Sequence, residues 1–96
     1  MSPRFEWDAG KAAANERKHG ISFEEAQAVF FDDNARIIND SEHSQAEDRF
    51  VILGMSSRHR ALVVVHCYRK DDAVIRLISA RKATKRERAQ YEEHIQ

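Results

Sequence analysis

An unbroken apolar run, "ALVVVHCY" at residues 61–68, restricts the possible folds of this chain more than any other feature. A strand that is apolar at almost every position is typical of the middle of a sheet, where both faces are covered. The run lies within a predicted strand at Arg60–Arg69, and the turn-prone stretch "RKDDA" leads into a second strand at Val74–Arg81. These two strands are expected to form an antiparallel hairpin.

Signals for helices and further strands lie on both sides of this hairpin. Ser22 with Glu25, and Thr84 with Glu87, have the spacing of a helix capping box. The predicted elements are a strand at Arg4–Trp7, a helix from the cap Asp8 to about His19 before a left-handed Gly20, a helix in "ISFEEAQAVFF", strands at Arg36–Asp40 and Arg49–Met55, the hairpin, and a last helix from Thr84 to about His94. The order β-α-α-β-β-β-β-α predicts an α+β fold in which helices pack on a small antiparallel sheet.

Length and composition are those of one folded domain spanning residues 1–96. The chain is 42% hydrophobic and 33% charged, which argues against disorder. The sequence has no apolar run long enough to cross a bilayer and no leader pattern, so no membrane partner is expected. Its lone cysteine, Cys67, predicts a reduced thiol, as is usual in the cytoplasm, where we expect the protein to act.

Charge is distributed unevenly along a chain whose net charge is zero, with 16 basic and 16 acidic residues. Residues 1–48 hold 5 of the basic and 11 of the acidic residues, and residues 49–96 hold 11 basic and 5 acidic ones. This predicts a basic face that could collect a polyanion such as RNA. The alternative is that folding interleaves the two halves into ordinary surface ion pairs.

The densest positive charge lies where the last strand meets the last helix, in "RLISARKATKRERAQY" at residues 76–91. The amino end of a helix carries partial positive charge, so Lys85 and Arg86 in its first turn are locally unfavourable. Free backbone amides with surrounding cations would instead trap an anion such as phosphate. The alternative is a solvated basic cap, with Arg88 paired to Glu92 one turn later.

The hairpin register decides which side chains share a face of the sheet. If Asp71–Asp72 is a two-residue turn, His66 lies opposite Leu77 and Leu62 lies opposite Arg81. His66, Ser79 and Arg81 would then share one face, and a one-residue change in the turn would reverse that assignment.

Two other histidine-containing groups are candidate sites. His43 and Glu47 could form an acid/base pair, although a merely exposed role in a loop is the better prediction. His66 and Cys67 are neighbours on a strand and point to opposite faces, which argues against a joint metal site.

The segments "FEWD…K…N…KHGISFEEA…VF.D" and "RLISARKATKRER..Y" resemble the BrnT family, the toxins of BrnT–BrnA toxin–antitoxin modules. The resemblance runs from about Phe5 to Tyr91. It implies a fold similar to the RelE-like toxins and an endoribonuclease that halts translation. It also implies a ribbon-helix-helix antitoxin that neutralises the toxin, and binding of operator DNA only through the antitoxin complex.

RNA cleavage by the neighbouring 2′-hydroxyl needs proton transfer and cations around the phosphate, and it requires neither a metal nor another cofactor. The family's strand motif implies phosphate contacts by Arg76 and Arg81. Proton-transfer candidates are His66 and Glu87, although Glu87 also belongs to a capping box. The remaining candidates are Tyr91, for which helix-to-sheet packing is the alternative, and the RNA-backbone contacts Lys82, Lys85, Arg86 and Arg69.

Two functions other than catalysis are compatible with these residues. A non-catalytic module could use the basic face to bind nucleic acid or an acidic partner. A DNA-binding regulator could use the first two helices as a helix-turn-helix, but the acidic first half of the chain would repel DNA.

Overall fold

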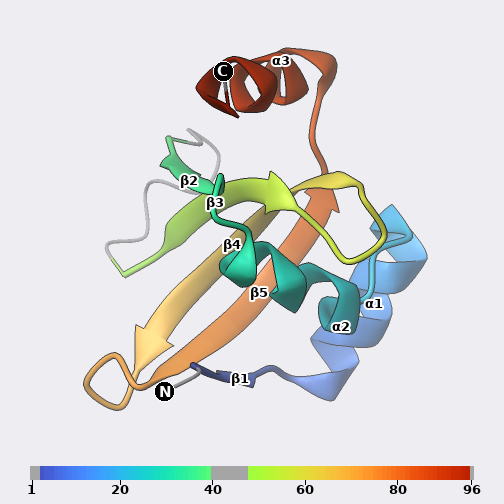
Figure 1. Ribbon diagram of the computed structural model, residues 1–96. Coiled ribbons are helices and arrows are strands. Elements are labelled where there is room, and N and C mark those ends of the chain that lie inside the picture. Colours follow the sequence, from blue (N-terminus) through green and yellow to red (C-terminus); the bar gives the residue numbers. More distant parts are fainter. Residues whose placement is uncertain (1–2, 40–47, 96) are drawn as a thin grey trace.

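The computed structural model describes residues 3–39 and 48–95, and it contains one five-stranded sheet with the order β1-β5-β4-β3-β2. In Figure 1, α2 and η1 cross the front of the sheet, α1 lies beside them, and α3 lies beyond the end of β5. The elements are β1 (Arg4–Glu6), α1 (Ala9–His19), α2 (Phe23–Ala26), the 3₁₀ helix η1 (Gln27–Phe31), β2 (Arg36–Ile38), β3 (Phe50–Met55), β4 (Ala61–Arg69), β5 (Val74–Lys82) and α3 (Lys85–Ile95).

The central strand β4 has apolar layers on both of its faces, as the unbroken apolar run predicted. Residues 61–66 of this strand are all buried. On one face, Leu62 and Val64 pack with residues of α2 and η1 and with the side chain of Ile21. On the other face, Val63 and Val65 pack with residues of β3 and with Tyr91 of α3. The run is therefore apolar throughout because α2 and η1 cover one of its faces and Tyr91 of α3 packs on the other.

The sheet is mixed, which corrects the expectation of a wholly antiparallel sheet. β1 pairs with β5 in the parallel direction, with Arg4 opposite Val74 and Glu6 opposite Arg76. The other neighbouring pairs are antiparallel. A three-residue edge strand carries no sequence signal for its direction, because its alternating side chains look the same from either end.

Asn15 of α1 continues the sheet where β1 stops. Its side-chain amide donates to the backbone oxygen of Ala80 at 2.9 Å and accepts from the Ala80 amide at 3.0 Å. It also donates to the backbone oxygen of Ile21 at 3.0 Å, and it is 7% exposed. An amide side chain has the same donor and acceptor groups as a peptide unit, so Asn15 replaces the missing strand at this part of β5.

The turn between β4 and β5 matches the predicted two-residue turn. Asp71 and Asp72 both have positive φ, at 55° and 69°, as in a type I′ turn, and the Ala73 amide donates to the Lys70 oxygen at 3.1 Å. The prediction that His66 lies opposite Leu77 is confirmed.

Beyond this point a bulge changes the register of β5. Val65 pairs with Ser79 although His66 pairs with Leu77, so one extra residue, Ile78, is inserted. Leu62 consequently lies opposite Lys82 and not opposite Arg81, which corrects the predicted pairing. A bulge moves every later side chain to the opposite face, and the residue pattern did not reveal it.

The first helix begins and ends as predicted. Asp8 accepts a hydrogen bond from the Lys11 amide at 2.8 Å, and Gly20 has a φ of 71°. The second helix is shorter than expected, because its regular α turn ends at Ala26 and it continues as η1. The strand predicted at Arg36–Asp40 is β2, which ends at Ile38. Asp40, the last residue of the predicted strand, and the pair His43 and Glu47 lie outside the described residues.

Close packing of η1 on β3 depends on Gly54. A Cβ atom at this position would lie 2.8 Å from the Val29 Cγ1 atom and 2.8 Å from the Ala35 Cβ atom. Both distances are shorter than carbon–carbon contact distances. Gly54 thus allows η1 and the segment after it to lie directly on the strand.

Replacing Asn15 by alanine should destabilise the fold strongly for a single polar residue. The variant leaves the Ala80 amide and carbonyl unpaired in a buried place, which should lower the free energy of unfolding by on the order of 2–3 kcal/mol. Asn15→Asp should also be destabilising, because a carboxylate cannot donate to the two carbonyl oxygens. Urea denaturation measures both, with the exposed Glu16→Gln of the same helix as a control. An Asn15→Ala protein as stable as that control would contradict this role.

Candidate nucleic-acid cleft

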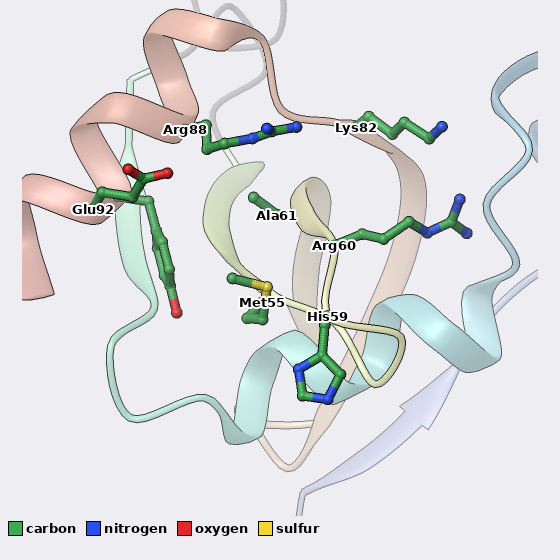
Figure 2. A pocket seen from close by; sticks show the side chains of 8 residues that line it. Met55, His59, Arg60, Ala61, Lys82, Arg88 and Glu92 are labelled. Atoms are coloured by element: carbon green, nitrogen blue, oxygen red, sulfur yellow. The ribbon is translucent and has the colours of Figure 1, made fainter.

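A cleft of about 300 Å³ opens between the β3–β4 turn, the end of β5 and α3. In Figure 2, Arg60 and Lys82 project toward the same side, and Arg88 reaches across from α3 toward the strand that carries Lys82. The cleft is lined by Met55, His59, Arg60, Ala61, Lys82, Arg88, Tyr91 and Glu92. Three cations and one histidine thus line one small cleft.

Arg60 is held from behind by a buried carboxylate. Its Nε donates to Glu25 Oε2 at 2.9 Å, and its Nη2 donates to Glu25 Oε1. Glu25 is 5% exposed and also accepts a hydrogen bond from the Ser56 hydroxyl at 2.6 Å. The Arg60 guanidinium lowers the pKa of Glu25 and outweighs the opposite effect of burial. The pair is therefore ionised at neutral pH.

The cations of the cleft have unused hydrogen-bond donors. Arg60 Nη2 also donates to the Gly20 oxygen at 3.3 Å, whereas its Nη1 has no hydrogen bond within the part of the chain that the structure describes. Lys82 and Arg88 form no ion pair with another described residue, so Arg88 is not paired with Glu92. Unused donors of this kind can bind phosphate oxygens.

A tight turn at residues 56–60 places His59 at the mouth of the cleft. The Ser56 amide donates to the Arg60 oxygen at 2.9 Å, and the His59 amide donates to the Ser56 oxygen at 3.0 Å. His59 has a φ of 59°, a left-handed conformation that is uncommon for a residue with a side chain. Its imidazole is exposed beside Arg60. The turn thus fixes the backbone from which both side chains project.

At the junction of β5 and α3, Glu87 pairs with Arg81 and caps the helix. The Thr84 amide donates to Glu87 Oε1 at 2.8 Å and the Glu87 amide donates to Thr84 Oγ1 at 3.1 Å, which confirms the predicted capping box. The Arg81 guanidinium donates to both oxygens of the same carboxylate, at 2.8 and 3.0 Å, and it lowers the pKa of Glu87. The anion position at this helix start is thus filled by a side chain of the protein.

Tyr91 anchors α3 to the rest of the molecule. It is 3% exposed, and its hydroxyl donates to Asp32 Oδ2 at 2.6 Å. The same carboxylate accepts from the amides of Met55 and Asn34, at 2.8 and 2.9 Å. Burial and the Asp32 carboxylate raise the pKa of Tyr91 to about 12. The hydroxyl therefore stays protonated, and the structure supports the packing alternative for this residue.

Comparison with known proteins places this architecture in a family. A family model described as the ribonuclease toxin BrnT of type II toxin–antitoxin systems matches residues 7–87. The chain belongs to the BrnT family. No curated protein sequence matched it. The crystal structure of the Brucella abortus ribonuclease toxin BrnT is similar in fold, with a TM-score of 0.67 and 20% identity over 88% of this chain and 100% of that one.

The site residues predicted from the sequence of this BrnT-family chain lie in four places, one of them the interior position of His66. Lys82 and Tyr91 line the cleft, and Arg81, Glu87 and Lys85 lie at the adjoining start of α3. Arg86 lines a separate groove with β2. Arg76 and Arg69 lie toward the other end of the hairpin, where Glu6 binds them at 2.8 and 3.6 Å.

His66 lies away from the cleft, which corrects its predicted place on a face shared with Ser79 and Arg81. The bulge at Ile78 puts those two residues on the other face of the sheet. His66 is fully buried against Phe30, with ring centroids 4.7 Å apart, and its Nε2 has no hydrogen-bond partner among the described residues. A side chain in this position cannot reach RNA without opening the core.

Sequence reasoning missed Arg60, His59 and Arg88 as a group. The sequence predicts Arg60 as the start of a strand, and Arg88 as part of the basic junction or as the partner of Glu92 along its helix. The cationic turn "SSRHR" at residues 56–60 was a usable signal, because it precedes the central strand at the end where the last strand finishes. No spacing rule connects Glu25 with Arg60, since their contact depends on packing across the fold.

The buried His66 should make stability depend on pH. Burial lowers the pKa of His66, so the unfolded chain binds a proton more readily than the folded one. Stability should therefore fall as pH decreases below about 6.5, the usual histidine pKa. Denaturation at several values between about pH 5 and 8 measures this slope. His66→Phe should reduce the slope. His19→Gln, which removes a half-buried histidine whose pKa is also lowered, should reduce it less. An unchanged slope in His66→Phe would contradict this account.

Proposed function

We propose that this chain is an endoribonuclease toxin that inhibits translation in the cytoplasm by cleaving RNA through attack of a 2′-hydroxyl on the neighbouring phosphate. The observation that carries the proposal is the cleft in which Arg60, Lys82 and Arg88 present unused donors, in a chain of a ribonuclease toxin family. Cations in such a place favour the phosphate-rich backbone of RNA. The RelE-like relationship of the fold belongs to the same proposal.

In the proposed reaction, the three cations and the histidine of the cleft divide three tasks among them. Arg60 offsets charge on the pentacoordinate phosphate through its unused Nη1 donors, and Lys82 and Arg88 hold the flanking backbone. His59 transfers the proton, the role for which the sequence offered His66 and Glu87, because an imidazole can both accept and donate one. His59 accepts the proton of the 2′-hydroxyl, the bond from the 2′-oxygen to phosphorus forms as the bond from phosphorus to the 5′-oxygen breaks, and the 5′-oxygen leaves with a proton returned by His59; no metal is required.

The predicted residues outside the cleft have supporting roles in this proposal. Arg81 stays bound to Glu87 and supports the start of α3, and Lys85 and Arg86 extend the basic surface along α3. Arg76 and Arg69, which share Glu6, are too far along the hairpin to join Lys82 at one phosphate, so any RNA contact there would be a second one.

The decisive experiment compares RNA cleavage by the wild type and by cleft variants. Arg60→Ala should lower the cleavage rate on the order of 10²- to 10³-fold, because it removes a donor aimed at transition-state charge. Lys82→Ala should weaken binding of all RNA sequences and reduce the salt dependence of binding by about one charge. Lys11→Ala, an exposed cation of α1, is the matched control. An RNA with a 2′-deoxy sugar at the cleaved position should bind and remain whole.

The second candidate function, a non-catalytic binding module, gives different outcomes in the same experiment. It predicts RNA or acidic-partner binding with no cleavage at any site, and expression of the chain alone should not arrest growth. If Arg60→Ala cleaves RNA as fast as Lys11→Ala, the cleft is not the active site.

The proposed partner is a ribbon-helix-helix antitoxin that covers the cleft, with operator DNA bound only by the complex. A protein that covers part of Arg81–Arg88 should protect Lys82 and Lys85 from acetylation in solution, while Lys11 reacts at the same rate in both states. Mass spectrometry of the toxin alone and in the complex measures this. Equal labelling of Lys82 in an inhibited complex would mean that inhibition uses another route, such as blocked access to the ribosome.

A further inference from the structure

We propose that Glu25 is a positioning residue for RNA cleavage, which acts by holding Arg60 in one orientation before RNA binds. The inference rests on the proposed function, and it assigns to α2 a part in the active site. Glu25 does not line the cleft, and it is 5% exposed. Glu25 therefore does not touch RNA itself, and among the described residues Arg60 is the cation that it contacts.

The side chain of Glu25 is available for this task because its helix does not use it. In a complete capping box, the carboxylate of Glu25 would bind back to the amide of Ser22. Here only half of the box forms: the Ser22 hydroxyl accepts from the Glu25 amide at 3.1 Å. The Glu25 carboxylate instead accepts hydrogen bonds from the Ser56 hydroxyl and from two nitrogens of Arg60. Its contacts thus lead from the helix toward the β3–β4 turn.

Several segments fix the orientation of the guanidinium. Glu25 of α2 binds Nε and Nη2, and the turn after α1 supplies the Gly20 oxygen for Nη2. Ser56 at the end of β3 holds the carboxylate, and its hydroxyl also accepts from the Arg60 amide at 3.3 Å. The side chain of Arg60 is still 27% exposed, and its Nη1 has no partner among the described residues. One edge is anchored and the other edge is available to a phosphate.

An anchored arginine lowers the barrier because its freedom is lost during folding and not during the reaction. The same contact places a negative charge behind the cleft, which weakens attraction of the RNA backbone. Replacing Glu25 by glutamine should therefore have opposite effects on the two steps. Binding of the 2′-deoxy RNA should stay equal or become tighter, while cleavage of bound RNA becomes slower by about 10- to 100-fold.

The test is a double-mutant cycle on the full-length chain, with cleavage of one RNA under saturating conditions and binding of its 2′-deoxy form measured side by side. The variants are Glu25→Gln, Arg60→Ala and the two combined, with the exposed Glu24→Gln of the same helix as the matched control. If Glu25 acts through Arg60, Glu25→Gln slows cleavage in the wild type and has no further effect in Arg60→Ala. Melting temperatures set the assay temperature below the transition of every variant.

Ser56→Ala gives the same test with a milder change, in case Glu25→Gln does not fold. It removes the hydroxyl that fixes the carboxylate but keeps the ion pair, so cleavage should slow by a smaller factor with unchanged binding of the 2′-deoxy RNA. The proposal is overturned if Glu25→Gln, or Ser56→Ala in its place, cleaves like Glu24→Gln, or slows cleavage equally with and without Arg60. A wild type that binds RNA but never cleaves it would instead overturn the proposed function, and the positioning role with it.

Discussion

The pairing of β4 with β5 is the interaction on which the rest of the structure depends. Because β4 is apolar on both faces, the hairpin is stable only when one layer covers each side. One layer consists of α2 and η1 with the residues around them, and the other includes Tyr91 of α3. The requirement for two layers brings the amino-terminal helices and the carboxy-terminal helix to the same end of the hairpin. The cleft lies where they meet.

The uneven charge of the two halves of the chain has a mixed outcome in three dimensions. Acidic residues of the first half do pair with basic residues of the second, as Glu6 does with Arg76 and Glu25 does with Arg60. Those pairs match the alternative in which folding interleaves the halves. Lys82 and Arg88 have no such partner among the described residues. A local excess of positive charge therefore survives at the cleft although the chain as a whole is neutral.

Local signals in the sequence predicted the local parts of this structure. The Asp8 cap, the left-handed Gly20 and the turn at Asp71–Asp72 each depend on a few neighbouring residues, and each was predicted. The bulge at Ile78 and the parallel direction of β1 depend on how distant segments fit together, so no short pattern encodes them. The bulge changed the predicted site most, because it separates His66 from Arg81.

The same distinction applies to the site. Lys82 and Arg81 could be assigned to the end of the molecule where the cleft lies, because they belong to the end of a recognisable strand and precede a recognisable helix. Arg60 could not, since its contact with Glu25 spans 35 positions and depends on where α2 crosses the sheet. A buried ion pair between distant residues becomes predictable only when the path of the chain is known.

The attachment of α3 has a consequence for the dynamics of the molecule. Of its eleven residues Tyr91 is the one that is buried; the hydrogen bond from its hydroxyl to Asp32 joins the helix to the end of η1, and the ion pair of Glu87 with Arg81 joins its first turn to β5. A helix with so little buried apolar surface can detach while the hairpin and the amino-terminal helices stay folded, at a free-energy cost below that of global unfolding. Its backbone amides should therefore exchange with deuterium faster than those of β4. One wall of the cleft, with Arg88 and Glu92, would thus open and close on its own, independently of the wall that carries Arg60.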